Sequence, residues 1–537
     1  MHTSQDQSRR MEIHRLMSEA AAVYGRGDHV LAAQLCARVL ALEPAMPEAL
    51  HLAGVCALAA GDPRQARVLL EQAAALKPGD AQLAHNLGIA RTEAGDLGGA
   101  RAAFAHAAAL DPQNPSAQFN LGVISEKQGD AEQAEAAYRR CFLLAPHDAV
   151  AAASLAALRE QKGAIEEAAR WCETALRLDP KEPVARITRA QLHFRAGEYD
   201  PAAVILEGLQ PEALSLRNRA LATGKLGMVY DRMDRPAEAW RMFLAAKETL
   251  RAGVPGVDTG VYSFAVAERI DRNLEALLAA APPAEGEAPV FLLGFPRSGT
   301  TLLDQILAGH PGIAVLEEKD TLLAWAQRHL LDDASLRAFM ETSPQALAED
   351  QRRYWRRVED YLPGRPQGQL LVDKMPLNTL FLPVLVRLFP AARFIFALRD
   401  PRDVVLSCFM QTFALNEAMR HFLTLQEAAD FYAAVMDIGR RSLTALPERI
   451  HQVRYEDLVE DPEREARRLL EFLGMQWDPG VLDVQTTAKR RRINTPSYHQ
   501  VARPIYGDAR GRWRRYERQL EPVMEKLEPF VKAFGYK

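Results

Sequence analysis

Cysteine is scarce in this chain of 537 residues, and long apolar runs are missing altogether. The five cysteines are odd in number and scattered, which argues against a disulfide scaffold and fits a reducing compartment. No apolar run approaches the roughly 18–20 residues of a membrane-spanning helix, and the N-terminus leads into a mixed polar helix rather than an apolar signal segment. We therefore expect a cytoplasmic protein without a membrane span.

A strong charge of one sign and the spacing of metal ligands are also missing. The formal net charge is −4 at pH 7, and neither half of the chain has the positive excess that nucleic-acid binding requires. The thirteen histidines and five cysteines show no metal-ligand spacing. Hydrophobic residues make up 48% and charged residues 25% of the chain, as in ordinary soluble proteins. These observations predict a protein of two or three domains that uses neither nucleic acid nor metal.

The N-terminal part of the sequence repeats with a fixed period of 34 residues. In each unit, glycine ends one helix and permits a turn, alanine lets two helices approach closely, and proline stops the second helix. The tripeptide Asn-Leu-Gly recurs at the same interval, beginning at Asn86 and Asn120. The periodic positions are Gly27, Gly61, Gly95, Gly129, Gly163 and Gly197, then Ala32, Ala66, Ala100, Ala134, Ala168 and Ala202, and finally Pro44, Pro78, Pro112, Pro146 and Pro180.

This pattern resembles the tetratricopeptide repeat family, whose unit is a helix–turn–helix of 34 residues. The resemblance covers residues 14–215 and implies an α-solenoid whose concave surface binds a peptide or protein segment. Asn86 and Asn120 would face that surface, where they hold either a partner's backbone or the neighbouring helices. The alternative is a scaffold that mediates self-association or supports the second domain. A homo-oligomer is compatible with the pattern but is not indicated by it.

Composition divides the rest of the chain. We expect the repeat array at residues 1–215, helical linker structure with a degenerate repeat near Gly227 at 216–286, and a further domain at 287–537. The run from Ala281 to Gly286, which contains two adjacent prolines, is the clearest boundary.

The further domain begins with a loop suited to an anionic group. An apolar run, Val290–Leu293, enters Gly-Phe-Pro-Arg-Ser-Gly-Thr-Thr, which opens into a helical pattern. A strand, loop and helix in this order place backbone N–H groups and a helix N-terminus around one small space, which holds phosphate or sulfate. The loop differs from a nucleoside-triphosphate loop, because Thr300 stands where the lysine would be and the cation is Arg297 instead. This predicts a nucleotide with one 5′ anionic group rather than a magnesium-bound triphosphate.

Apolar runs and helical patterns then alternate, which favours a parallel sheet with helices on both faces and ligands at the carboxyl ends of its strands. The expected fold is therefore α + α/β, with an N-terminal α-solenoid followed by a P-loop-like α/β domain around a central parallel sheet. The expected strands are 290–293, 370–372, 393–398 and 451–453, and the expected helices are 302–307, 378–388 and 403–412.

Two motifs in the right order carry a second resemblance. Phe-Pro-Arg-Ser-Gly-Thr-Thr at 295–301 and Arg-Asp-Pro-Arg-Asp-Val-Val-Leu-Ser at 399–407 resemble the sulfotransferase family over residues 289–537, and more narrowly its protein-tyrosine sulfotransferases and bacterial tetratricopeptide–sulfotransferase fusions. The resemblance implies 3′-phosphoadenosine 5′-phosphosulfate as the sulfuryl donor. It assigns the 5′-phosphosulfate to Arg297, Ser298, Gly299, Thr300 and Thr301, and the 3′-phosphate to Arg399 and Ser407. Arginine suits phosphate because its planar fork matches two oxygens. The alternative for Arg399 is a salt-bridged strand end.

The same resemblance assigns the chemistry. Glu318 would be the base that deprotonates the acceptor, and Glu317 is the alternative base. If neither is catalytic, the pair would simply lie at a solvated helix start. Lys374 would carry positive charge at the leaving oxygen, unless it merely pairs with Asp373. Ser497 would stabilise the transferred group. Transfer of this kind depends mainly on positioning and charge stabilisation, so no metal is needed.

Two further residues would contact the nucleotide. Tyr455 would pack on it, or else be a sheet-edge aromatic. Arg512 would close over it, at the end of a basic stretch from Lys489 to Arg518 whose excess charge calls for an anion. A solvated basic face and nucleic-acid binding are the weaker interpretations of that stretch.

The sequence departs from the tyrosine-type pattern at two places. Asp320 stands where that pattern has arginine two residues after the catalytic glutamate, which leaves the acceptor class open. Gln411 replaces an arginine four residues after Ser407.

Three functions compete. The first is a sulfotransferase that acts on a protein or peptide tyrosine, or on a carbohydrate, lipid or small-molecule hydroxyl; the repeat array favours a macromolecule. The second is a non-catalytic repeat scaffold with a nucleotide-binding domain, which the retained Arg297, Glu318 and Lys374 disfavour. The third, a kinase-type enzyme, is disfavoured by Thr300.

Overall fold

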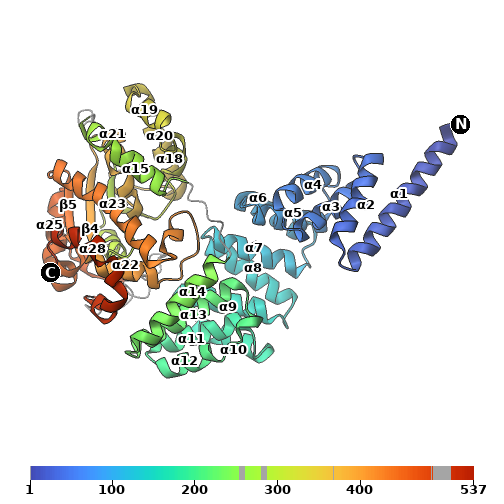
Figure 1. The fold of residues 1–537 in the computed structure, drawn as a ribbon, viewed down its shortest axis with the longest axis horizontal. Coiled ribbons are helices and arrows are strands. Elements are labelled where there is room, and N and C mark those ends of the chain that lie inside the picture. Colours follow the sequence, from blue (N-terminus) through green and yellow to red (C-terminus); the bar gives the residue numbers. More distant parts are fainter. Residues whose placement is uncertain (1, 253–259, 280–286, 367, 485, 488–509) are drawn as a thin grey trace. The chain divides into compact units, whose positions relative to one another are not determined.

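The computed structural model describes residues 2–252, 260–279, 287–366, 368–484, 486–487 and 510–537 (Figure 1). The chain forms two compact units, Met1–Leu192 and His193–Lys537. The division into three segments at 215 and 286 stays a prediction.

The first unit is a solenoid of paired helices, as the repeat predicts. Their lengths follow the 34-residue period, because each second helix of a pair ends two residues before a periodic proline, as α2 does at Leu42. The helices are α1 (His2–Gly25), α2 (His29–Leu42), α3 (Pro47–Ala59), α4 (Pro63–Leu76), α5 (Ala81–Glu93), α6 (Leu97–Leu110), α7 (Pro115–Lys127), α8 (Ala131–Leu144), α9 (Ala149–Gln161), α10 (Ile165–Leu178) and α11 (Pro183–Ala196).

The periodic residues do what their chemistry requires. All six periodic glycines have positive φ, between 74° and 85°, a region that other residues adopt at a cost. In the first four units an aspartate follows the glycine and caps the next helix, as Asp28 does by accepting a hydrogen bond from the N–H of Leu31. All six periodic alanines are fully buried, with no exposed surface. The prediction of a tetratricopeptide-type solenoid is confirmed.

Asn86 and Asn120 bind neighbouring helices. The Nδ2 atom of Asn86 lies 2.7 Å from His51 Nε2, and that of Asn120 lies 2.8 Å from His85 Nε2. Each pair joins the first helices of successive repeats, so the amides stabilise the stacking of the units. Of the two roles expected for these asparagines, the structure shows the second.

A helical hairpin opens the second unit. It consists of α13 (Leu216–Arg232) and α14 (Pro236–Arg251), preceded by α12 (Tyr199–Glu207) and the 3₁₀ turn η1 (Pro211–Ala213). A Cβ at Gly227 would lie 2.6 Å from the Phe243 ring, just as one at Gly88 would lie 2.6 Å from the Phe104 ring at the same sequence offset. The hairpin therefore packs like a repeat of the first unit.

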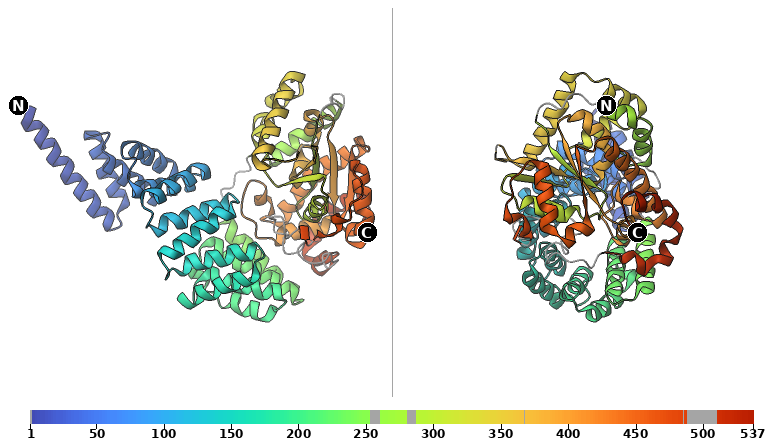
Figure 2. Two further views of the ribbon diagram at one scale, coloured as in Figure 1. Left: turned by 180° about the vertical axis from the view of Figure 1, so that it is seen from behind. Right: turned by 90° about the vertical axis from the view of Figure 1, so that its left-hand side faces the viewer.

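The centre of the second unit is a five-stranded parallel sheet with the order β2-β3-β1-β4-β5 (Figure 2). Its strands are β1 (Val290–Gly294), β2 (Ile313–Glu317), β3 (Leu370–Lys374), β4 (Arg393–Leu398) and β5 (Ile450–Arg454). The four expected strands are present; β2 was not expected. The predicted helix 378–388 is a 3₁₀ segment, η2 (Pro376–Phe381), followed by α21 (Leu382–Leu388).

Helices cover both faces of the sheet. Leu303 and Leu469 pack with Leu292 on one face. On the other face Gly439 approaches Phe396 so closely that a Cβ would lie 2.6 Å from its ring. The remaining elements are α15 (Phe264–Arg272), α16 (Leu274–Ala279), α17 (Thr300–Ala308), α18 (Leu323–His329), α19 (Asp333–Met340), α20 (Pro344–Tyr361), α22 (Pro401–Met410), η3 (Met419–Phe422), α23 (Leu425–Ala445), α24 (Tyr455–Glu460), α25 (Pro462–Leu473), η4 (Pro479–Leu482), η5 (Arg512–Tyr516) and α28 (Glu517–Ala533).

Across the residues that the structure describes, no helix is both long and apolar enough to cross a membrane.

Candidate active site

The loop between β1 and α17 is tightly curled. Arg297 and Gly299 both have positive φ, 73° and 91°. Glycine is required at 299 for a second reason, since a Cβ there would lie 2.7 Å from the Tyr455 ring. Ser298, Thr300 and Thr301 are buried, and the two threonines begin α17. A curled loop that ends in a helix N-terminus is a good site for an anion.

Arginine and serine side chains converge on this loop from the next strand and helix. Arg297 Nε donates a hydrogen bond of 3.1 Å to Ser407 Oγ on α22. Arg399, at the end of β4, donates one of 3.1 Å to the carbonyl oxygen of Arg297, and its guanidinium lies 5.0 Å from the centre of the Tyr455 ring. The structure therefore brings together Arg297, Arg399, Ser407 and Tyr455, as expected for one ligand site.

The Arg399 guanidinium also lies 3.8 Å from the carboxylate of Asp403, within α22. The structure thus shows the salt bridge expected as the alternative role of Arg399, while its contact with the 3′-phosphate stays a prediction. Burial lowers the pKa of Arg297 to about 10, helped by the positive charges of Arg399 and Arg512. Arg297 is still protonated at neutral pH, and an anion would relieve the repulsion.

A second cluster forms around Lys374, the last residue of β3. Its ammonium lies 2.8 Å from Glu318 Oε1, 3.2 Å from Asp304 Oδ2 and 3.4 Å from Glu317 Oε1. Lys374 and Asp304 have no exposed surface, whereas the side chain of Glu318 is 38% exposed. Burial lowers the pKa of Lys374, but the three carboxylates outweigh it and leave the pKa above its ordinary value.

The strand register explains this cluster. Glu317 is the last residue of β2 and is paired with Lys374 of β3. Glu318 follows with a φ of 46°, and its N–H donates a 2.8 Å hydrogen bond to the Lys374 carbonyl oxygen. The interpretation of these glutamates as a solvated helix start is wrong, because Glu317 ends a buried strand and Glu318 directly follows it. The geometry holds the expected base and the expected cation in direct contact.

Asp373 lies on the opposite face of the sheet from Lys374, because successive strand residues point to opposite sides. Its Oδ2 accepts hydrogen bonds from Thr321 Oγ1 at 2.8 Å and from the Tyr354 hydroxyl at 2.9 Å. Burial raises the pKa of Asp373 to about 6, against the lowering effect of these two hydrogen bonds. The alternative that Lys374 is simply the partner of Asp373 is therefore wrong.

Helix α17 joins the two clusters, since it starts in the anion loop and carries Asp304 to Lys374. Thr379 provides a second link, because its Oγ1 accepts a 2.8 Å hydrogen bond from the N–H of Gly294, at the end of β1. Both clusters thus lie at the carboxyl ends of neighbouring strands, where parallel sheets bind ligands. Asp304 and Thr379 could not be chosen from the sequence, since each lies beside one other polar residue in a largely apolar segment.

Arg512 lies in η5 and pairs with a residue that the sequence did not indicate. Its Nη2 atom is 2.5 Å from Asp231 Oδ2 on α13. Asp231 is only 3% exposed and also accepts a 2.6 Å hydrogen bond from the Tyr516 hydroxyl. The expected contact of Arg512 with the nucleotide stays a prediction. Ser497 and most of the basic stretch lie outside the described residues.

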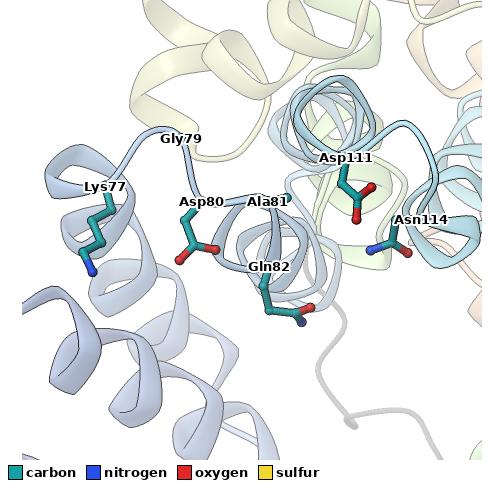
Figure 3. Close-up of a pocket in the computed structure, with 7 residues that line it drawn as sticks. All are labelled: Lys77, Gly79, Asp80, Ala81, Gln82, Asp111 and Asn114. Carbon is teal, nitrogen blue, oxygen red and sulfur yellow. The ribbon is translucent and has the colours of Figure 1, made fainter.

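A polar pocket in the first unit has a structural explanation (Figure 3). Asp80 caps α5 and Asn114 caps α7, while Lys77 pairs with Glu48. Asp80, Asn114 and Lys77 thus already have partners in the repeat helices. The pocket is lined by Lys77, Gly79, Asp80, Ala81, Gln82, Asp111 and Asn114. Among the residues with described positions, no group of three or more His, Cys, Asp or Glu is arranged to hold a metal.

Comparison with known proteins gives the class of each part. Residues 289–479 match the model of the sulfotransferase family. Tetratricopeptide repeat models match residues 24–87, 85–141, 126–183 and 160–223. The chain therefore combines tetratricopeptide repeats with a C-terminal domain of the sulfotransferase family, as both resemblances predicted.

Individual relatives share parts of this arrangement. An uncharacterized protein of Aquifex aeolicus (strain VF5) is 28% identical over 337 residues, which cover 60% of this chain and 43% of the relative. The chain thus spans less than half the length of that relative. Protein-tyrosine sulfotransferase 1 of Danio rerio is 26% identical over 271 residues, covering 46% of this chain and 72% of the relative. The omega-hydroxy-beta-dihydromenaquinone-9 sulfotransferase Stf3 of Mycobacterium tuberculosis (strain CDC 1551 / Oshkosh) is 30% identical over 148 residues, covering 25% and 36%.

Proposed function

We propose that this protein is a sulfotransferase that moves a sulfuryl group from 3′-phosphoadenosine 5′-phosphosulfate to an acceptor hydroxyl. The observation that carries the proposal is the contact between Glu318 and Lys374, 2.8 Å apart at the strand ends that also carry the anion loop. A carboxylate that reaches solvent next to a buried ammonium supplies a base and a cation at one place.

The chain's own groups divide the work. The loop from Arg297 to Thr301 would hold the 5′ phosphosulfate, and Arg399 with Ser407 would hold the 3′-phosphate. The donor supplies the sulfuryl group. Glu318 accepts the proton of the acceptor hydroxyl as the hydroxyl oxygen bonds to sulfur. Lys374 carries positive charge beside the donor's bridging oxygen as the bond between that oxygen and sulfur breaks. 3′-Phosphoadenosine 5′-phosphate leaves.

The acceptor is proposed to be a tyrosine in a protein or peptide. The similarity to protein-tyrosine sulfotransferases supports this choice, and so does the repeat array, whose concave face would bind the peptide segment. Five free, buried cysteines support a reducing compartment, the cytoplasm, as the place of action. Incubation with labelled donor and a panel of tyrosine peptides, oligosaccharides and phenols tests the acceptor. Label that enters only oligosaccharide or phenol would contradict the tyrosine assignment.

Calorimetry tests the donor first, because it needs no knowledge of the acceptor. The wild type should bind 3′-phosphoadenosine 5′-phosphate with a micromolar dissociation constant and prefer it to Mg-ATP, and Arg399→Ala should lose most of this affinity. Arg352→Ala, on the exposed face of α20, is the matched control. A preference of the wild type for Mg-ATP, or no binding of either nucleotide, would reject the proposed function.

A further inference from the structure

Lys247 is a buried lysine of the repeat-like hairpin, next to the anion loop. It lies on α14 and is only 4% exposed. Its ammonium donates a 2.7 Å hydrogen bond to the carbonyl oxygen of Gln411, just beyond α22, and lies 5.6 Å from the centre of the Phe409 ring. Both contacts fall within the second compact unit.

The charge of this ammonium is not balanced by an acid in the part of the chain that the structure describes. Among the residues whose positions are described, no carboxylate lies within ion-pair distance of Lys247. A backbone carbonyl satisfies one of the three N–H groups of an ammonium and does not neutralise its charge. A buried charge without a counter-ion is costly, and burial lowers the pKa of Lys247 to about 8. Lys374 is equally buried, but three carboxylates surround it.

The segment that Lys247 contacts also contacts the anion loop. Cys408, one residue after Ser407, has its Sγ 3.3 Å from the carbonyl oxygen of Pro296 in that loop. Burial raises the pKa of this thiol to about 12, while the positive charges of Arg297, Lys247 and Arg399 act to lower it. The thiol thus stays neutral, and three cations act on its pKa. Arg297 and Arg399 are the two that contact the expected ligand site.

We propose that Lys247 is a further cation of the donor site, and that the anionic group held near Ser407 and Arg399 is its counter-ion. The inference rests on the proposed function, since it assigns that group to the 3′-phosphate of the donor. The competing explanation is that Lys247 only caps the C-terminal end of α22.

Calorimetry with two nucleotides separates these explanations. The probes are 3′-phosphoadenosine 5′-phosphate and adenosine 5′-phosphate, which lacks the 3′-phosphate. Lys247→Gln should weaken binding of the first about 10- to 100-fold, the range for a lost charge-assisted hydrogen bond, with little effect on the second. Lys247→Arg should recover part of the affinity because it keeps the charge. Arg241→Gln, an exposed position on the same helix, should bind as the wild type does.

Proton uptake on nucleotide binding is a second test and needs no variant. If Lys247 only capped α22, nucleotide binding would not change its protonation. At pH 8 about half of the free protein would have a neutral Lys247, so binding of the bisphosphate should take up about half a proton, measured in buffers of different ionisation enthalpy. Cys408 does not titrate there, and Arg297, with a pKa of about 10, remains charged.

Each outcome is decisive. Equal binding by Lys247→Gln and the wild type, or an equal loss for both nucleotides, would overturn the role of Lys247 while leaving the proposed function in place. A wild type that binds neither nucleotide would reject the proposed function, and this inference with it.

Discussion

Arg297 and Ser407 are joined by a hydrogen bond of 3.1 Å between Nε and Oγ, although 110 residues separate them in the sequence. The bond ties the loop after β1 to α22, and so connects the two motifs that resemble the sulfotransferase family. A hydroxyl that holds an arginine in place can also donate its own hydrogen to a phosphate oxygen.

Ser407→Ala should therefore weaken binding of 3′-phosphoadenosine 5′-phosphate by about fivefold, the usual effect of one lost hydrogen bond. The fold should be unaffected, since only one hydroxyl is removed. Ser442→Ala is a suitable control, because that serine is also buried but its hydroxyl bonds to Ile438 of its own helix. Unchanged nucleotide affinity in Ser407→Ala would contradict the prediction.

Glu318→Ala should abolish turnover while nucleotide binding remains. The expected loss in kcat is about 10²- to 10⁴-fold, as for removal of a general base. Glu341→Gln, an exposed acid at the end of α19, should leave kcat unchanged. Full activity of Glu318→Ala would show that Glu318 is not the base, and Glu317 would be the next candidate.

Lys374→Met should destabilise the protein by about 3–5 kcal/mol at pH 7, because it leaves the buried carboxylates of Asp304 and Glu317 without their cation. Denaturant unfolding at pH 7 measures it. A loss well below this range would contradict the prediction.

Asp231→Asn should weaken the attachment of η5 to α13. It removes the charge that Arg512 and Arg515 share and leaves the Tyr516 hydroxyl with a poorer acceptor, for an expected loss of about 2–4 kcal/mol. Asp234→Asn is the matched control, since Asp234 is 87% exposed and pairs with Arg515. Equal stability of the two variants would contradict a role for Asp231 in holding η5.

Asp373 should make stability depend on pH. Its pKa is raised from 3.8 to about 6 by burial, so the folded protein holds the proton more tightly than the unfolded chain. The stability gained from that proton is fully present below about pH 4 and is lost as the pH rises through about 6.

The neutral variant Asp373→Asn lacks this dependence. Its free energy of unfolding relative to the wild type should rise by about 3 kcal/mol between pH 4 and pH 7. Asp360→Asn, an exposed site on α20, should show no such trend. A difference between Asp373→Asn and the wild type that does not change with pH would mean that Asp373 titrates normally.

Much of the fold could be predicted because it rests on local chemistry. Gly27 and its periodic equivalents need positive φ, and their period gives the helix lengths directly. Strand β2 was missed because Ile313–Glu317 is short and leads into two successive acids, Glu317 and Glu318, a composition equally typical of an exposed helix start. Its place beside β3 depends on tertiary pairing.

The candidate site could be predicted where motifs are contiguous, as at 295–301 and 399–407. What could not be predicted are the partners. That Lys374 contacts Asp304, Glu317 and Glu318 rather than Asp373 follows from the strand register. That Arg512 contacts Asp231 follows from the packing of a helical hairpin more than 280 residues away in sequence. Neither fact leaves a local signal.

The hairpin α13–α14 also bears on how such a chain can be assembled from modules. Its helices pack like repeats, but its Asp231 and Lys247 make hydrogen bonds to Arg512 and Gln411 in the domain that follows. Suppose that two genes exchange their repeat arrays at residue 289, where the match to the sulfotransferase family begins. The C-terminal domain would then lose the hairpin residues that contact it. A crossover ahead of the hairpin would keep Asp231 and Lys247 with the residues that they contact, so we expect the last repeat-like unit to be inherited with the C-terminal domain rather than with the array.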